Sequence, residues 1–197
     1  MAPALLRSAS SQDITTVEPA WTSADCDNDG LTNNEEVTGV DDPSTPADPN
    51  GVTTDPQDPD TDGDGVTDGQ EAIDGTDPNN PCDYQASSQD LATVDAAWSD
   101  TDCDSDGLTN GEEVTGIDDP STPADPNGVT TDPQDQDTDG DGVTDGQEAL
   151  DGTDPNDPCS YNASSQDLTT VEPTWTSADC DNDGLTNNEV RPWRRIR

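Results

Sequence analysis

The stretch Asp60-Thr-Asp-Gly-Asp-Gly-Val-Thr-Asp-Gly-Gln-Glu71 decides how the rest of the chain is interpreted. Aspartates occupy alternate positions at its start, a glycine follows at Gly65, and a glutamate ends it at Glu71. Three other stretches repeat this spacing in full, and a fourth begins in the same way but ends in Val190. We number the five stretches in chain order as loops 1 to 5: 25–36, 60–71, 102–113, 137–148 and 179–190.

The spacing D-x-D-x-D-G-x5-E is that of a calcium loop of the EF-hand type. Ca2+ takes about six to eight hard oxygen ligands, so carboxylates at loop positions 1, 3 and 5 wrap one face of the ion. Glycine at position 6 permits the sharp turn, the carbonyl of position 7 adds a ligand, position 9 binds directly or through water, and glutamate at position 12 closes the site. The predicted ligands are Asp25, Asp27, Asp29, Leu31, Asn33 and Glu36; Asp60, Asp62, Asp64, Val66, Asp68 and Glu71; Asp102, Asp104, Asp106, Leu108, Asn110 and Glu113; and Asp137, Asp139, Asp141, Val143, Asp145 and Glu148.

Loop 5 keeps the aspartates Asp179, Asp181 and Asp183 but has Val190 where the glutamate belongs. The sequence therefore predicts Ca2+ as the bound cofactor, with four complete sites and a fifth, degraded one. Magnesium is disfavoured because it keeps its waters and prefers fewer carboxylates. Transition metals are disfavoured because the chain has no histidine.

The composition argues against a conventional globular core and against several classes of partner. Only 25% of the 197 residues are hydrophobic, aromatic residues make up 3%, and the formal net charge is −42. Such a charge repels nucleic acid and anionic membranes, and no stretch approaches the ~20 apolar residues that span a bilayer. We expect neither nucleic-acid binding nor membrane insertion. We also expect no enzyme, because metal coordination closes the carboxylate sites and leaves no open catalytic position.

The loops belong to a repeat of 77 residues, because Trp21, Trp98 and Trp175 recur at that interval. Between loops 1 and 2, and again between loops 3 and 4, lies a segment dense in Pro, Asn and Gly that predicts turns and extended chain. The predicted organisation is an aberrant N-terminus (1–8), a partial repeat (9–25), repeat unit 1 (26–102), repeat unit 2 (103–179), a partial repeat (180–189) and an aberrant basic tail (190–197). The unmatched ends have two interpretations: a window cut from a longer array, or a basic tail that docks on an acidic loop of the next molecule.

Five cysteines in an acidic, secreted-looking chain favour disulfides. Their spacings alternate between 56 and 21 residues. Pairing across 21 joins Cys82 to Cys103 and Cys159 to Cys180, leaving Cys26 without a partner because its counterpart position is Leu5. Pairing across 56 is the alternative and leaves Cys180 odd.

The loops, together with the flanking Gly75-Thr-Asp-Pro78, resemble thrombospondin type 3 repeats in the form common in bacterial surface proteins. The resemblance implies a chain wound around a row of Ca2+ ions that acts as a stalk or spacer. The expected fold is a mostly irregular, calcium-stabilised, elongated repeat rod with short helical turns after the loops. The flanking amphipathic helices of a true EF-hand are lacking, which disfavours a calcium sensor that opens a hydrophobic groove.

The leading functional hypothesis is a structural calcium-binding segment of an extracellular stalk or fibre, at a bacterial cell surface. The alternative is an adhesin module that recognises a surface or glycan, and a third is a spacer for an enzyme domain elsewhere. The near-identity of the repeats, with 15 differences between 26–102 and 103–179, favours the structural role. The partners considered are calcium, further copies of the chain joined end to end, and glycans.

Overall fold

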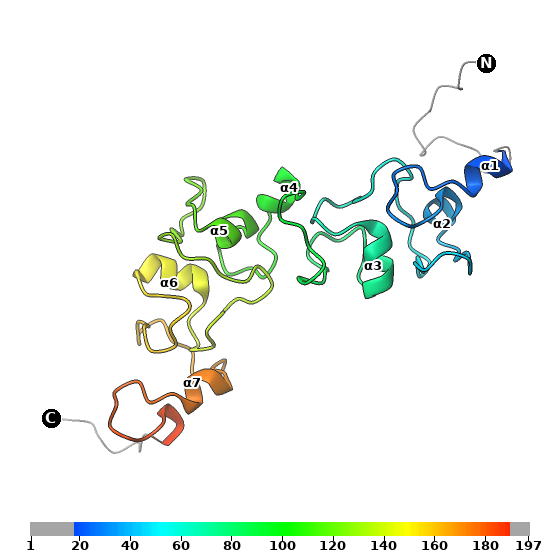
Figure 1. The fold of residues 1–197 in the computed structure, drawn as a ribbon. Helices are drawn as coiled ribbons and strands as arrows, with labels where there is room; N and C mark the ends of the chain where they lie inside the picture. The colour runs from blue at the N-terminus through cyan, green and yellow to red at the C-terminus, as the bar shows by residue number, and fades with distance from the viewer. Residues whose placement is uncertain (1–17, 190–197) are drawn as a thin grey trace. The chain divides into compact units, whose positions relative to one another are not determined.

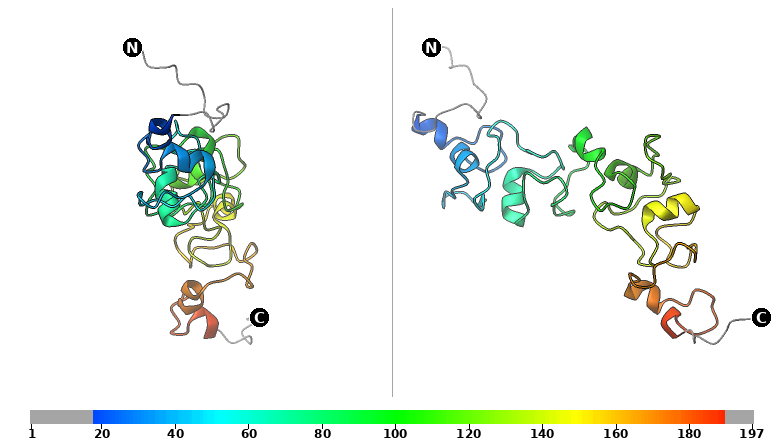
Figure 2. Two further views of the ribbon diagram at one scale, coloured as in Figure 1. Left: turned by 90° about the vertical axis from the view of Figure 1, so that its right-hand side faces the viewer. Right: turned by 180° about the vertical axis from the view of Figure 1, so that it is seen from behind.

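The computed structural model describes residues 18–189, and the predicted aberrant segments at the two ends lie outside them. The chain divides into two compact units, an N-terminal unit (1–98) and a C-terminal unit (99–197), which we describe separately. Only short helices interrupt the irregular backbone, and no strand occurs between residues 18 and 189 (Figures 1 and 2). The expected irregular repeat fold with short helical turns is confirmed. The elements are α1 (Pro19–Thr22), α2 (Asn33–Thr38), α3 (Asp68–Asp74), α4 (Ala96–Ser99), α5 (Asn110–Thr115), α6 (Asp145–Asp151), α7 (Pro173–Ser177) and the 3-10 turn η3 (Asn187–Glu189).

Each of α2, α3, α5 and α6 begins at position 9 of a loop, and local sequence explains both of its ends. A threonine caps the first turn, as in α2, where the Thr32 hydroxyl accepts from the Glu35 amide and the Glu35 carboxylate reaches back to the Thr32 amide. A glycine in the left-handed conformation ends each helix, for example Gly39 at φ 65° and Gly75 at φ 81°. Helices this short owe their stability to these caps and to neighbouring contacts.

The remaining helices carry the repeated tryptophans. Pro19 and Pro173 start α1 and α7, where the fixed φ of proline suits the first helical turn. In the N-terminal unit α1 contacts α2, and in the C-terminal unit α7 contacts η3 (Figure 1). Trp98 in α4 is fully buried and Trp175 in α7 is nearly so.

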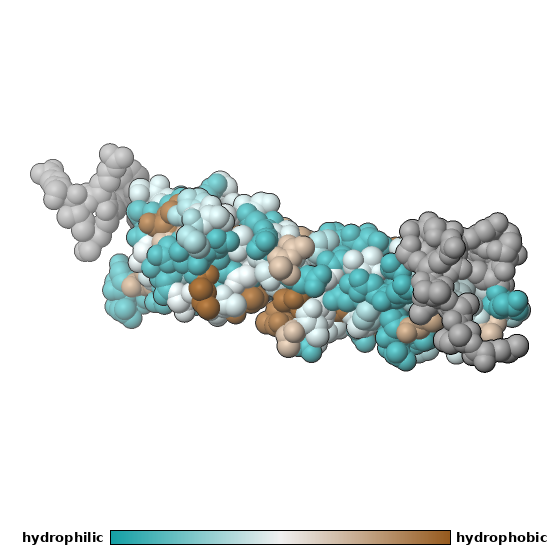
Figure 3. Space-filling view, turned by 90° about the horizontal axis from the view of Figure 1, so that it is seen from above, coloured by the Kyte–Doolittle hydropathy of each residue, from teal (hydrophilic) through white to brown (hydrophobic). Residues whose placement is uncertain are grey.

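The interior of each unit is small and largely polar. Leu31, Ala47 and Val66 are buried in the N-terminal unit, and Leu108, Ala124 and Ala149 form a cluster in the C-terminal unit. Acidic side chains fill much of the remaining buried volume, although charged residues are almost never fully buried unless paired. The surface in Figure 3 is mainly hydrophilic with scattered apolar patches. Within residues 18–189, none of the helices has the length and apolar character that crossing a bilayer requires.

Candidate metal centres

The aspartates of each loop shape its backbone through hydrogen bonds that do not depend on an ion. In loop 2 the carboxylate of Asp60 accepts from the amides of Gly63 and Gly65, both at 2.9 Å. The carboxylate of Asp64 then accepts from the Val66 amide at 2.8 Å. These bonds require left-handed backbone at position 6, where Gly65 has φ 89°.

Position 4 of every loop is also left-handed, which the sequence analysis did not anticipate. The residues there are Asn28, Gly63, Ser105, Gly140 and Asn182, with φ between 56° and 78°. Glycine and asparagine tolerate this conformation best, so their recurrence at position 4 was a signal that could have been used. With positions 4 and 6 both turned, the side chains of positions 1, 3 and 5 face a common centre.

The aspartates at positions 1, 3 and 5 converge in all five loops. In each loop, one carboxylate oxygen from each of the three residues lies within 4.8 Å of the other two. The sets are Asp25, Asp27 and Asp29; Asp60, Asp62 and Asp64; Asp102, Asp104 and Asp106; Asp137, Asp139 and Asp141; and Asp179, Asp181 and Asp183. The glutamates at position 12 lie outside these three-residue sets among the described residues.

The position-12 glutamates nevertheless lie close enough to the aspartates of their own loops for the negative charges to interact. Glu36, Glu71, Glu113 and Glu148 are all fully buried. One oxygen of Glu113 accepts from the Thr131 hydroxyl at 3.1 Å, and Thr54 and Thr76 serve Glu36 and Glu71 in the same way. Oε2 of Glu36, Glu71 and Glu113 is buried without a hydrogen-bond partner, as are both carboxylate oxygens of Glu148. The orienting threonines were missed by the sequence analysis, although they recur in both repeat units.

Several carboxylate oxygens of the aspartates are likewise buried without a hydrogen-bond partner. Both oxygens of Asp27 are buried and unpartnered, as is Oδ2 of Asp62, Asp64, Asp104, Asp139 and Asp141. A buried polar group without a partner costs free energy, and a buried charge costs far more. A cation among these oxygens removes that cost, and an all-oxygen, carboxylate-rich donor set is the one that Ca2+ prefers. The residues present therefore fit a calcium ion.

Without an ion, the crowding of carboxylates is visible in their pKa values. Burial, together with the negative charges of Asp27 and Asp29, raises the pKa of Glu36 to about 9. Burial and like charge also raise the pKa of Glu71 and Glu113 to about 9. Burial, then the charge of Asp64, raises the pKa of Asp62 to about 7. A divalent cation reverses this effect, because it favours the charged form of every carboxylate that it contacts.

Residues at position 9 contact position 2 of their own loop. The Asp68 carboxylate accepts from the amide of Thr61 at 2.8 Å and from its hydroxyl at 2.7 Å. In loop 3 the Asn110 side chain accepts from the Cys103 amide at 3.1 Å. The structure thus shows position 9 closing the loop on itself, and its contribution to an ion stays a prediction. The same holds for the carbonyl at position 7, whose residues Leu31, Val66, Leu108 and Val143 are buried.

The residue at position 11 differs between loops 1 and 3 on the one hand and loops 2 and 4 on the other. In loops 1 and 3 it is Glu35 or Glu112, and the Glu35 carboxylate accepts from the Asp42 amide at 2.9 Å and the Thr45 hydroxyl at 2.7 Å. Although burial raises the pKa of Glu35, these and other hydrogen bonds hold it below its ordinary value. In loops 2 and 4 the residue is Gln70 or Gln147. Glu35 therefore fastens the segment that follows α2, while Glu36 faces the metal site.

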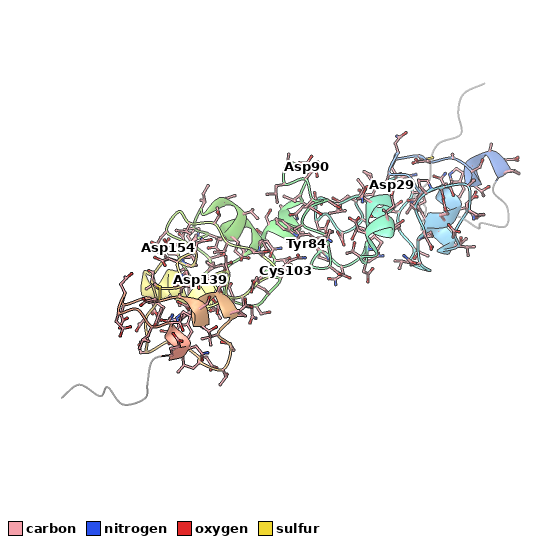
Figure 4. The ribbon with its side chains drawn as sticks, turned by 60° about the horizontal axis from the view of Figure 1, so that its bottom comes forward. Asp29, Tyr84, Asp90, Cys103, Asp139 and Asp154 are labelled. Carbon is pink, nitrogen blue, oxygen red and sulfur yellow. A yellow bond between two sulfur atoms is a disulfide. The ribbon has the colours of Figure 1, made fainter. Side chains whose placement is uncertain are left out.

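The two loops of a repeat unit touch through a glycine. The Gly69 amide, at position 10 of loop 2, donates to Oδ2 of Asp29 in loop 1 at 2.8 Å, and Asp29 lies beside α3 in Figure 4. A Cβ on Gly69 would lie 2.3 Å from the Asp29 carbonyl oxygen. In the C-terminal unit Gly146 donates to Asp106 in the same way. Only glycine permits this approach, so the second loop helps to fix a carboxylate of the first.

The cysteines divide into bonded and free. Cys159 and Cys180 form a disulfide across 21 residues, with Cα atoms 5.2 Å apart. Cys82 and Cys103 are also disulfide-bonded. Cys26 is free and exposed.

Comparison with known proteins gives one result. A model of the bacterial TSP3 repeat matches residues 25–39, 60–81, 102–116, 137–158 and 179–189. These matches contain the four complete loops and the described part of loop 5. No curated protein and no solved structure matches the chain.

Proposed function

The chain belongs to the bacterial TSP3 repeat proteins, and from that premise we propose that it is a structural segment of an extracellular stalk or fibre, held in shape by Ca2+. As a tandem TSP3 repeat protein it is a calcium-binding repeat module. The proposal adds the number of ions, the compartment and the mechanical role. The binding set is the one predicted from the sequence, with loops 1 to 4 complete and loop 5 weak.

The observation that carries the proposal is the burial of unpartnered carboxylate oxygens where a globular protein would bury apolar side chains. Glu36, Glu71, Glu113 and Glu148 are fully buried, whereas the apolar cluster of the C-terminal unit consists, among the described residues, of Leu108, Ala124 and Ala149. A chain built in this way gains folding free energy from metal binding, because the site does not exist in the unfolded state. Calcium thus takes the place of a hydrophobic core.

Disulfides and calcium support the proposed extracellular location, and the repeat organisation supports the proposed stalk. Disulfides persist in oxidising environments, and millimolar calcium is also extracellular, which favours export. Repeats that contact only their neighbours extend naturally in one dimension. Ca2+ in loops 1 to 4 would offset only part of the formal charge of −42, so parallel copies repel each other sideways. End-to-end growth with further copies avoids that repulsion, and we propose it as the mode of assembly.

Small-angle X-ray scattering of the full chain with calcium and with a chelator tests the proposal. We expect the radius of gyration to rise on chelation and to return when calcium is restored, because the carboxylates of the empty loops repel one another. Magnesium at the same concentration is the control and should restore little of the compact state. An unchanged radius of gyration in chelator would contradict the calcium-dependent structural role.

A second candidate, glycan recognition, is favoured by one local difference between the compact units. A polar cavity of about 580 Å³ in the C-terminal unit is lined by Gln136, Asp137 and Glu172 among others. The corresponding cavity in the N-terminal unit has Pro59 in place of Gln136 and measures about 220 Å³. Glycan-array binding by the native chain that disappears in Gln136→Pro would establish this candidate. Equal signals from both proteins would exclude this cavity as the site.

A further inference from the structure

Two segments with almost the same sequence end up in different surroundings. Residues 18–35 and 172–189 differ only at Ala20 and Thr174. Both build the same local scaffold. The Asn33 side-chain amide donates to the Trp21 carbonyl at 2.8 Å and to Cys26 Sγ at 3.3 Å. Its counterpart Asn187 makes the matching bonds to Trp175 and Cys180 at 2.8 Å and 3.2 Å.

The C-terminal copy of this scaffold is covered. Cys180 forms the disulfide with Cys159, and its sulfur also contacts the Pro158 carbonyl at 3.6 Å. Two residues after Cys159, the Tyr161 ring meets the Trp175 ring edge-on, with centroids 6.2 Å apart. Tyr84 and Trp98 repeat this geometry at 6.1 Å. A Cys-x-Tyr segment is therefore what covers a tryptophan helix in this protein.

Among residues 18–189, no Cys-x-Tyr segment covers the N-terminal copy of the scaffold, since the two that occur there pack on Trp98 and Trp175. Cys26 is free and exposed, and Trp21 is partly exposed where Trp175 is buried. Asn33 is fully buried with its side-chain oxygen unpartnered, and its amide group is directed at Cys26. In the C-terminal copy the same oxygen of Asn187 accepts from the Cys180 amide at 3.5 Å. The site around Cys26 is thus arranged like a disulfide-bonded one.

This chain contains no internal cysteine that could complete the site. The other four cysteines are all disulfide-bonded. In the register of the repeat, Leu5 and Arg7 stand where Cys159 and Tyr161 stand in the C-terminal copy. A disulfide at Cys26 must therefore be made with a cysteine outside residues 1–197.

We propose that Cys26 and the ring of Trp21 form an acceptor site for a Cys-x-Tyr segment of another polypeptide, which docks by its tyrosine and is joined by a disulfide. The bond forms by thiol–disulfide exchange. The Cys26 thiolate attacks the cysteine sulfur of a partner held as a mixed disulfide, the new bond joins the two cysteines, and the original partner thiol leaves as a thiolate. The proton of Cys26 passes to solvent, and one disulfide is consumed for the one formed. The inference rests on this local geometry and does not depend on the stalk function.

A symmetric dimer through two Cys26 residues fits the site less well. Cys26 is position 2 of loop 1, so a Cys26–Cys26 bond would bring two sets of Asp25, Asp27 and Asp29 together. Like charges so placed repel. It would also leave each Trp21 without an aromatic partner, whereas edge-on aromatic pairs stabilise contacts beyond simple burial.

The test uses the full chain in calcium and a synthetic peptide of residues 158–172 whose Cys159 carries a thiopyridyl group. Release of thiopyridone reports the exchange rate, and peptide mapping locates the bond at Cys26. A peptide with Tyr161→Ala is the matched control. We expect the native peptide to react about threefold to tenfold faster, the range that one aromatic pair contributes. In the Trp21→Ala protein both peptides should react at the slower rate.

Glutathione mixed disulfide measures the reactivity of the Cys26 thiol without docking, and each protein's peptide rates are divided by its own glutathione rate before they are compared. Equal rates for the two peptides on the native chain would overturn the proposal, because no tyrosine docking would then exist. Faster formation of a Cys26–Cys26 dimer than of the peptide adduct would overturn it in favour of a symmetric contact.

Discussion

Residues Asp25–Glu35 and Asp179–Glu189 have the same sequence and different structures. In loop 1 the stretch continues into the six-residue helix α2 and buries Leu31, which is 1% exposed. In loop 5 it ends in the 3-10 turn η3, and the corresponding Leu185 is 42% exposed. Both keep the local turn, since Leu31 and Leu185 each donate to the aspartate at position 5, at 2.8 and 3.0 Å.

This difference distinguishes the turn, which a loop forms alone, from the burial, which a neighbouring loop adds. Loop 1 is followed by a second loop, whose Gly69 binds Asp29, and by the segment that Glu35 fastens. No further loop follows loop 5 in this sequence. Folding the turn is therefore local, whereas burying the metal site requires the next half of the repeat.

The largest expected effect concerns the glutamate that loop 5 lacks. We expect Glu36→Gln to weaken calcium binding at loop 1 by about 100-fold or more, because ligand charge sets the affinity of such loops. Calcium titration followed through the Gly30 amide resonance measures it. An unchanged affinity would remove Glu36 from the ligand set.

The reciprocal change concerns the residue at position 12 of loop 5. Val190→Glu supplies loop 5 with its missing carboxylate, and we expect its affinity to rise while staying below that of loop 1, which is covered by a second loop. The Gly184 amide resonance reports on loop 5 in the same titration. If the altered loop 5 matched loop 1, the contribution of the neighbour would be negligible.

The next largest effect is the difference in unfolding free energy lost when Leu31 or Leu185 is replaced by alanine. Leu31→Ala removes a buried side chain and should cost about 2–4 kcal/mol of unfolding free energy in calcium. Leu185→Ala removes an exposed one and should cost within about 0.5 kcal/mol. Denaturant unfolding of the two variants at a fixed calcium concentration compares them directly. Similar losses would mean that Leu185 is covered in solution.

A smaller effect is expected where the loops touch. Gly69→Ala places a methyl group against the Asp29 carbonyl and should cost about 1–3 kcal/mol by overpacking. Asn34→Ala, at the same position of loop 1, is the control. The expected signature in calcium titration is a loss of affinity at loop 1 as well as loop 2. Loss at loop 2 alone would show that the contact does not couple the loops.

The dependence on pH should be the most gradual effect. The pKa of Glu36 rises from 4.5 in its ordinary state to about 9 in the folded, metal-free chain. The folded state then binds more protons than the unfolded state between these values, so in chelator its stability should fall as pH rises through that window. In calcium the trend should reverse, because protons compete with the ion. Circular dichroism against pH in both conditions tests the sign, and Glu36→Gln should make the chelator curve less steep, because Glu71 and Glu113 still contribute.

Much of the fold and of the candidate site was predictable from the sequence. The alternation of aspartates around Gly65 predicted the loops, and the lack of large apolar side chains predicted an irregular fold with short helices. The residues that hold the ligands in place were not predictable, because Thr54 and Gly69 act on loop 1 from 18 and 40 residues away. No local pattern relates such distant positions.

The turn of each loop is set by local sequence, because an aspartate and a left-handed glycine within a few residues make the hydrogen bonds that define it. Local sequence also determined which oxygens are available to a cation. Which loops become buried sites was decided by the tertiary structure. Burial depends on surfaces contributed by distant segments, so Leu31 and Leu185 lie in identical local sequences but differ in exposure.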